Sequence, residues 1–167
     1  MMRAEHKMSK WDTRFFQLCH LTATWSEDRR RKVGAVIVGA ANEVRAIGYN
    51  GLPRGVSGKV DERHSPEERE KYHWFEHAER NAIYNAARAG TSVQGCRLYV
   101  SLFPCADCAR GIIQSGIVQV NTFDRPDKDD NFERSFEVAL TMFEEAQIEL
   151  RIFSEPRATL DEDVRED

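Results

Sequence analysis

The sequence of 167 residues lacks any apolar run close to the roughly 20 residues that a membrane-spanning helix needs. Its first ten residues also lack the apolar stretch of a secretory signal. We therefore expect a cytoplasmic protein with no membrane partner. Cysteine is scarce as well, with four residues. Without an export signal, these cysteines are expected to be thiols or metal ligands rather than disulfides.

An excess of positive charge is also missing. The formal net charge of −4 argues against a general nucleic-acid binder, so no long nucleic acid is expected as a partner. One compact basic run nevertheless stands at residues 29–32 (Arg-Arg-Arg-Lys). It is either a solvated surface segment or a site for a small anion such as a phosphate. Internal repeats and low-complexity segments are absent, and the length fits one domain.

Hydrophobic periodicity predicts alternating helices and strands. Ser9 is expected to cap a first helix together with Asp12, and the apolar face of that helix is predicted to include Trp11, Phe15, Leu18 and Trp25. Strands are predicted at residues 33–38, 44–49, 96–101, 117–123 and 148–153. Further helices are predicted at residues 77–89, 104–116 and 131–146, with a long loop at 51–64 and a short helix from residue 65.

This order predicts an α/β fold, a three-layer α/β/α sandwich around a mixed five-stranded sheet whose later strands are parallel. One domain is expected over residues 1–153, followed by an acidic, mobile tail at 154–167. Two helices, one from His77 and one from Pro104, are predicted to begin directly after a strand or loop. Ligands gather at such helix N-termini, because free N–H groups and the helix dipole meet there.

Those two helix starts carry the metal-binding pattern His-Ala-Glu and Pro-Cys-Ala-Asp-Cys. His77, Cys105 and Cys108 supply one imidazole and two thiolates, which is the three-ligand set of a catalytic zinc site with one position left for water. Glu79 lies two residues past the histidine, where a carboxylate can move protons beside the metal. The combination H-x-E with P-C-x-x-C is the signature of zinc nucleobase deaminases.

Two other interpretations of the motif stay open. A structural zinc site would take Cys96 or Cys19 as a fourth ligand, but it leaves Glu79 without a role. A thiol redox protein using the Cys-x-x-Cys pair would need no metal, and the His-x-Glu pattern counts against it. A second zinc could in principle be assembled from His64, His73 and Cys19.

The sequence resembles the dCMP deaminase family of the cytidine deaminase superfamily over roughly residues 11–153. The matching stretches are VGAVIV (33–38), GYNGLP (48–53), HAERNAI (77–83), SLFPCADC (101–108) and IIQSG (112–116). The resemblance implies a cytidine deaminase-like fold, a catalytic zinc, a nucleoside monophosphate substrate and a homohexamer. In regulated members dCTP with Mg²⁺ activates and dTTP inhibits.

The resemblance also implies residue roles. His77, Cys105 and Cys108 match the zinc ligands, and Glu79 matches the proton shuttle. Asn50 matches the asparagine that binds the sugar 3′-hydroxyl, although an asparagine before glycine also suits a plain turn. The remaining contacts would be made by the main chain, from Ala78 to the pyrimidine carbonyl and from Ser101, Leu102 and Phe103 to the departing amine.

Phosphate recognition is less defined. Arg30 matches a phosphate-contacting position in some similar enzymes, with Arg54 as a second candidate and Ser26 as a possible hydroxyl donor. Arg88 lies about 16 Å along the helix from His77, so it would reach a substrate only across a subunit interface. Gly51 resembles part of the effector-binding region.

The predicted reaction is zinc-dependent hydrolysis of dCMP to dUMP and ammonia, which supplies a thymidylate precursor. Water activated at zinc would attack C4, while Glu79 would protonate N3 and then the amine. The alternatives are deaminases acting on CMP, free cytidine, 5-substituted dCMP or tRNA adenosine. A non-catalytic, zinc-stabilised nucleotide-sensing module is the alternative of a different class.

Overall fold

The computed structural model describes residues 6–123 and 132–154 of the chain. The helices of this part are α1 (Lys10–Ala23), α2 (Lys71–Trp74), α3 (Ala78–Arg88), α4 (Ala106–Gln114) and α5 (Glu133–Glu145), with 3₁₀ turns at Asp61–His64 and Glu67–Arg69. The strands are β1 (Gly34–Val38), β2 (Val44–Tyr49), β3 (Arg97–Val100), β4 (Gln119–Phe123) and β5 (Glu149–Phe153). The predicted elements are confirmed, with ends that shift by one or two residues. The predicted tail, from residue 155 onward, lies outside the described residues.

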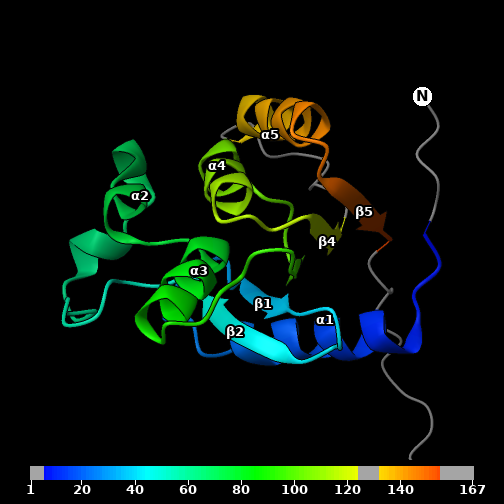
Figure 1. Ribbon diagram of the computed structural model, residues 1–167. Helices are drawn as coiled ribbons and strands as arrows, with labels where there is room; N and C mark the ends of the chain where they lie inside the picture. Colours follow the sequence, from blue (N-terminus) through cyan, green and yellow to red (C-terminus); the bar gives the residue numbers. More distant parts are fainter. Residues whose placement is uncertain (1–5, 124–131, 155–167) are drawn as a thin grey trace, which may run out of the picture.

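The strands form one mixed sheet in the order β2-β1-β3-β4-β5. Strand β1 pairs antiparallel with both β2 and β3, whereas β3, β4 and β5 run parallel to one another. Helix α1 covers one face of the sheet, and α3, α4 and α5 lie on the other face (Figure 1). The three-layer α/β/α prediction is therefore confirmed.

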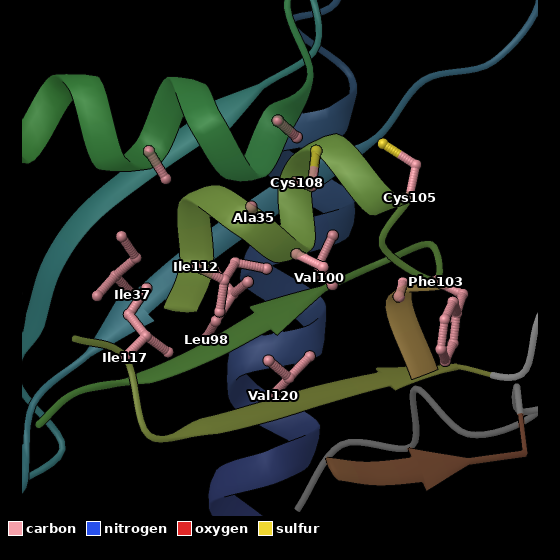
Figure 2. Close-up of a cluster of buried hydrophobic side chains, with 14 of the residues drawn as sticks. Ala35, Ile37, Leu98, Val100, Phe103, Cys105, Cys108, Ile112, Ile117 and Val120 are labelled. Atoms are coloured by element: carbon pink, nitrogen blue, oxygen red, sulfur yellow. The ribbon is translucent and has the colours of Figure 1, made fainter. Parts of the chain in front are cut away.

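Alternate residues of the central strands serve the two sides of the sheet, as the period-2 geometry of a strand requires. Ala35 and Ile37 join the larger core cluster under α3, α4 and α5, while Val36 and Val38 join the smaller cluster under α1. Figure 2 shows the larger cluster, with Cys105 and Cys108 at the start of α4 on its margin. The metal-ligand motif is thus anchored directly to the core.

Helix α1 confirms its predicted start but not its predicted face. The capping box is present, since Ser9 and Asp12 exchange backbone and side-chain hydrogen bonds. However, Trp11 and Trp25 are 44% and 51% exposed. The prediction that these two tryptophans belong to the core is wrong. The buried face of the helix includes polar residues, which a prediction from hydrophobicity alone excludes from the core. The buried residues of the helix are Asp12, Phe15, Phe16, Cys19, Thr22 and Ala23.

Asp12 is the centre of a buried polar network beneath the sheet. Its carboxylate accepts hydrogen bonds from the Tyr99 hydroxyl at 2.8 Å and from the Arg151 guanidinium at 3.2 Å. Burial raises the pKa of Asp12, but the hydrogen bonds from Ser9, Tyr99 and Arg151 outweigh it and hold the pKa below its ordinary value. The network ties α1 to the strands β3 and β5.

Asp12→Asn is expected to lower the free energy of unfolding at pH 7 by about 2 kcal/mol, because it weakens charge-assisted hydrogen bonds of the buried network. A depressed folded-state pKa gives stability that is present above the ordinary value of 3.8 and is lost as the pH falls through the folded value. Urea unfolding of both proteins should therefore show a difference in stability that narrows as the pH falls below 3.8. A difference of constant size would contradict this assignment.

Helix α3 approaches strand β2 closely at a glycine. A Cβ atom on Gly48 would lie 2.3 Å from both the carbonyl oxygen of Ala78 and the amide nitrogen of Ala82. Any larger residue would push α3 away from the sheet. This contact fixes the position of the helix start that carries His77 and Glu79.

The segment between β2 and α3 leaves the sheet after β2 and returns to the same place before α3. Its ends are joined by an antiparallel bridge between Gly51 and Glu76, and the predicted loop and short helix resolve into the two 3₁₀ turns and α2. Within the described residues, every helix is too short or too polar to cross a bilayer.

Candidate functional site

Two of the predicted metal ligands are N-cap residues. His77 precedes α3 and Cys105 precedes α4, and both have extended backbones. The start of α3 is held by Glu76, whose Oε1 accepts hydrogen bonds from the His77 amide at 2.9 Å and from the Arg80 Nε at 2.6 Å. Cys108 follows in the first turn of α4. Both helix N-termini therefore point their ligands at one place, as the spacing of the motifs predicts.

The geometry of these three side chains suits a tetrahedral zinc ion. The Nδ1 atom of His77 lies 3.3 Å from the Cys105 sulfur and 3.4 Å from the Cys108 sulfur, and all three ligand atoms lie within 4.8 Å of one another. Zn–S and Zn–N bonds of about 2.3 and 2.0 Å at a tetrahedral angle separate such atoms by about 3.5 Å. Three protein ligands leave one coordination position for water or substrate.

Within the described part of the chain, His77, Cys105 and Cys108 are the only group of three or more histidine, cysteine or acidic residues close enough together to hold a metal ion. The second zinc considered from His64, His73 and Cys19 is not assembled there. Cys19 is fully buried, and its thiol donates to the Tyr99 carbonyl at 3.4 Å.

In the absence of metal, the pKa values of the Cys105 and Cys108 thiols shift in opposite directions. A hydrogen bond from Cys108, together with His77, lowers the pKa of the Cys105 thiol far below its ordinary value. The same hydrogen bond and burial raise the pKa of Cys108. Cys105 therefore ionises more readily than Cys108, and a divalent cation bound between them would favour the thiolate form of both.

Glu79 lies in the first turn of α3 and is 4% exposed. Burial raises the pKa of its carboxyl group, while the neighbouring His77 opposes the rise. Glu79 also lines the same cavity as His77 and Cys105. It is therefore placed to exchange protons with a molecule in that cavity.

The cavity beside the ligand group has a volume of about 250 Å³. Five residues named from the sequence line it beside His77, Glu79 and Cys105, namely Arg30, Asn50, Ala78, Leu102 and Phe103. The Asn50 side chain is well held, since its Oδ1 accepts from the Val33 amide at 2.8 Å and its Nδ2 donates to the Arg31 carbonyl at 2.8 Å. The structure thus gathers most of the predicted site.

Two predicted residues support the wall of the cavity rather than line it. The Ser26 hydroxyl donates to the Asn50 carbonyl at 2.7 Å, and the Ser101 hydroxyl accepts from the Gly34 amide at 3.1 Å. Both hydroxyls are engaged with the backbone. A direct role of Ser26 in holding a phosphate therefore gains no support from its position.

Arg54, Arg88 and Gly51 lie elsewhere, around a second cavity of about 330 Å³. The Arg54 guanidinium donates to the Asn85 side chain at 2.5 Å. The structure does not bring Arg54 to the cavity beside the zinc ligands, because the loop after β2 turns along α3 instead. Arg88 shares the second cavity, consistent with its distance along the helix from His77.

Several residues of the first cavity were missed in the sequence. They are a lysine, a carboxylate and four aromatic residues: Lys71, Asp28, Tyr72, Phe75, Phe132 and Phe136. Arg31, which also lines the cavity, belongs to the basic run already noted as a possible anion site. Phe132 and Phe136 were expected only as part of the helix predicted at residues 131–146, and Lys71 and Tyr72 come from a short helix without periodicity. The Tyr72 and Phe132 rings meet edge to face at 5.4 Å. No local pattern in the sequence predicts that they line the cavity.

Residues 9–123 match the family model described as cytidine and deoxycytidylate deaminase zinc-binding region. An uncharacterized deaminase encoded in the luxG 3′ region of Aliivibrio fischeri is 40% identical over 148 residues, which is 86% of this chain and 93% of that protein.

Human deoxycytidylate deaminase is 44% identical over 114 residues, covering 66% of this chain and 63% of the human protein. The chain thus matches somewhat less than two thirds of the human protein's length. Among solved structures, the dCMP deaminase of cyanophage S-TIM5 in complex with dCMP and dUMP superimposes with a TM-score of 0.71 at 22% identity, covering 89% of this chain and all of that one. This structural likeness concerns the fold. The family match, the zinc-ligand group and the mixed sheet agree with one another. The chain therefore belongs to the cytidine and deoxycytidylate deaminase zinc-binding family.

Proposed function

We propose that the protein hydrolyses the exocyclic amine of dCMP, yielding dUMP, a thymidylate precursor, and ammonia. The observation that carries this proposal is that one cavity is lined both by His77, Cys105 and Glu79 and by the cationic side chains of Arg30, Arg31 and Lys71. The relatives named deoxycytidylate deaminase support the same substrate. A deaminase of CMP, cytidine or a 5-substituted dCMP would share the chemistry and differ in the fit of the pocket.

The reacting end requires a nucleophile and a proton carrier. Zinc held by His77, Cys105 and Cys108 would supply the Lewis acidity that activates water. Glu79 would accept a proton from the attacking water and deliver it to N3 of the ring as C4 is attacked. It would then take the proton of the new C4 hydroxyl group and pass it to the departing amine. The atoms balance, since dCMP and one water give dUMP and one ammonia.

The base is held by the helix start and by aromatic rings. The Ala78 amide is one of the first N–H groups of α3, which have no carbonyl of the preceding turn to bond, so it is available for the pyrimidine carbonyl. Carbonyl groups around residues 101–103 would accept from the amine. The rings of Phe132 and Phe136 stack at 5.9 Å beside the cavity and offer an apolar wall for a planar base.

The phosphate end is assigned to Arg30, Arg31 and Lys71. A phosphate monoester carries about −1.5 to −2 charges at pH 7, which cations in a partly enclosed site neutralise well. A tRNA adenosine substrate would need an extended basic surface, whereas the chain carries a net charge of −4. The mononucleotide is therefore favoured over a long nucleic acid.

Regulation is assigned to the second cavity. Its lining includes Gly51, Arg54 and Arg88, so it offers two cations to an anionic effector such as dCTP with Mg²⁺, with dTTP as a competing inhibitor. A homohexamer would place this cavity near neighbouring subunits. The exposed rings of Tyr49 and Tyr84 line this cavity, and the exposed Trp25 packs edge to face on Tyr49 at 6.0 Å, so the surface suits such contacts.

The test is a substrate panel followed by the loss of cytosine absorbance. Zinc-loaded protein is assayed with dCMP, CMP, deoxycytidine and dCTP, with and without added dCTP as effector. We expect kcat/KM for dCMP to exceed that for deoxycytidine by about 100-fold or more, since charge-assisted phosphate contacts supply that much. Equal values for the two would contradict the phosphate assignment. If none of the four compounds is turned over, with zinc bound and effector present, the proposed substrate class is contradicted.

A further inference from the structure

Asp28 is a buried carboxylate that the proposed mechanism leaves without a role. It is 4% exposed, stands in the segment between α1 and β1, and lines the same cavity as His77 and Cys105. A buried charge is costly unless it is paired and hydrogen-bonded. Its partners therefore indicate what the carboxylate holds in place.

One carboxylate oxygen of Asp28 organises the basic run. Oδ1 accepts hydrogen bonds from the backbone amides of Arg30 at 2.8 Å and Arg31 at 3.2 Å. The amide of Asp28 itself donates to the Ser26 hydroxyl at 3.1 Å. This local turn presents two neighbouring arginines at the cavity, although adjacent residues of an extended segment would point to opposite sides.

The other oxygen of Asp28 joins segments that are distant in the sequence. Oδ2 accepts from Lys71 Nζ at 2.8 Å and from Asn50 Nδ2 at 3.3 Å. The side chains of Asp28 and Lys71 are 5% and 9% exposed, so the ion pair is shielded from solvent. Helix α2 is attached to the cavity wall through this pair.

An exposed ion pair joins the same two segments, but outside the cavity. Arg29 contacts Asp61 at 2.7 Å, with side chains that are 59% and 80% exposed. Exposed pairs contribute little to stability or position. The chain thus provides its own control for the buried pair.

We propose that Asp28 is a positioning residue for the sugar and phosphate of the nucleotide. Its carboxylate holds Asn50, the turn with Arg30 and Arg31, and Lys71 in one wall, so that the wall is arranged before the substrate arrives. This inference rests on the proposed function and adds a residue that acts through its neighbours. Pre-arranged contacts of this kind are sensitive to small displacements, which can lower kcat/KM about 100-fold.

The two oxygens can be tested separately. Asp28→Asn keeps one side-chain oxygen, which can still accept from the backbone amides of Arg30 and Arg31. It replaces the second oxygen, which accepts from Lys71 and Asn50, with an NH₂ group that cannot accept. Asp28→Ala removes both functions. The matched control is Asp61→Asn, which neutralises the exposed pair. Each zinc-loaded variant is measured for equilibrium binding of dUMP, for kcat and KM with dCMP, for zinc content and for melting temperature.

We expect Asp28→Asn to weaken dUMP binding and raise KM for dCMP by about tenfold, and Asp28→Ala by about 100-fold. Zinc content should be unchanged and kcat should stay within about threefold, because Glu79 and the zinc ligands are untouched. Asp61→Asn should match the unaltered protein within about twofold.

Two results would overturn the inference: dUMP binding by Asp28→Asn equal to that of the unaltered protein, or the same weakening in Asp61→Asn. If Asp28→Asn does not fold, Asp28→Ser, which keeps a smaller oxygen acceptor for the two backbone amides and leaves Lys71 in place, is measured and read in the same way. Absence of dCMP turnover in the unaltered protein would instead refute the proposed function. The two failures are therefore distinguishable.

Discussion

Glu79→Gln is expected to lower kcat for dCMP by about three orders of magnitude while the protein keeps one zinc ion. The amide has nearly the same shape as the carboxyl group, but it cannot carry a proton between water, ring nitrogen and amine. Glu79 lies outside the ligand group, so the metal affinity should change little. The measurement combines steady-state turnover with zinc content after dialysis.

The matched control for this variant is Glu137→Gln, which removes an exposed carboxylate on α5 that pairs with Arg134 at 3.1 Å. It should keep full activity. Full activity in Glu79→Gln would eliminate the proton-carrier role. A non-catalytic nucleotide-sensing module predicts no difference between the two variants, because neither would change a turnover that is absent from the start.

Cys105→Ser is expected to lose zinc and, with it, turnover below about 1% of the original value. A serine hydroxyl is a far poorer zinc ligand than a thiolate, and it leaves two strong ligands, His77 and Cys108, where a stable site needs three. The same loss is expected for Cys108→Ser. Zinc content after dialysis against a weak chelator and turnover with dCMP are measured together.

Cys96→Ser provides the matched control, because Cys96 is a buried free thiol whose sulfur donates only a long hydrogen bond of 3.9 Å, to the Gln94 carbonyl. We expect it to retain zinc and activity. Equal zinc loss in this control would show that the metal site extends to Cys96, as in a structural zinc site. Turnover that survives complete removal of the metal would favour chemistry of the cysteine pair alone.

The sequence predicts the order of the elements well, because each depends on local patterns. The Ser9 capping box and the helix at residues 131–146 are predicted from local spacing, and the structure confirms them as the start of α1 and as α5. The zinc group was equally predictable. Its ligands stand at helix starts, and their convergence follows from the order of strands and helices.

The cavity wall was much less predictable, since its members meet only through tertiary contacts. Asp28 and Lys71 are 43 positions apart, and each alone resembles an ordinary surface charge in the sequence. Arg54 shows the opposite case, an arginine that seemed suitable for the phosphate until the loop placed it at the second cavity. Trp11 and Trp25 likewise looked like core residues, because the sequence does not reveal that Asp12 takes the buried position through its contact with Tyr99.

The most direct measurement of the central claim is the product balance of a single incubation. Zinc-loaded protein is mixed with dCMP, and dUMP and ammonia are quantified by chromatography and an ammonia assay, beside a metal-stripped sample restored with zinc. We predict equal amounts of the two products, none without metal and full recovery after zinc is returned. Unchanged dCMP in the zinc-loaded sample, or ammonia without dUMP, would contradict the account.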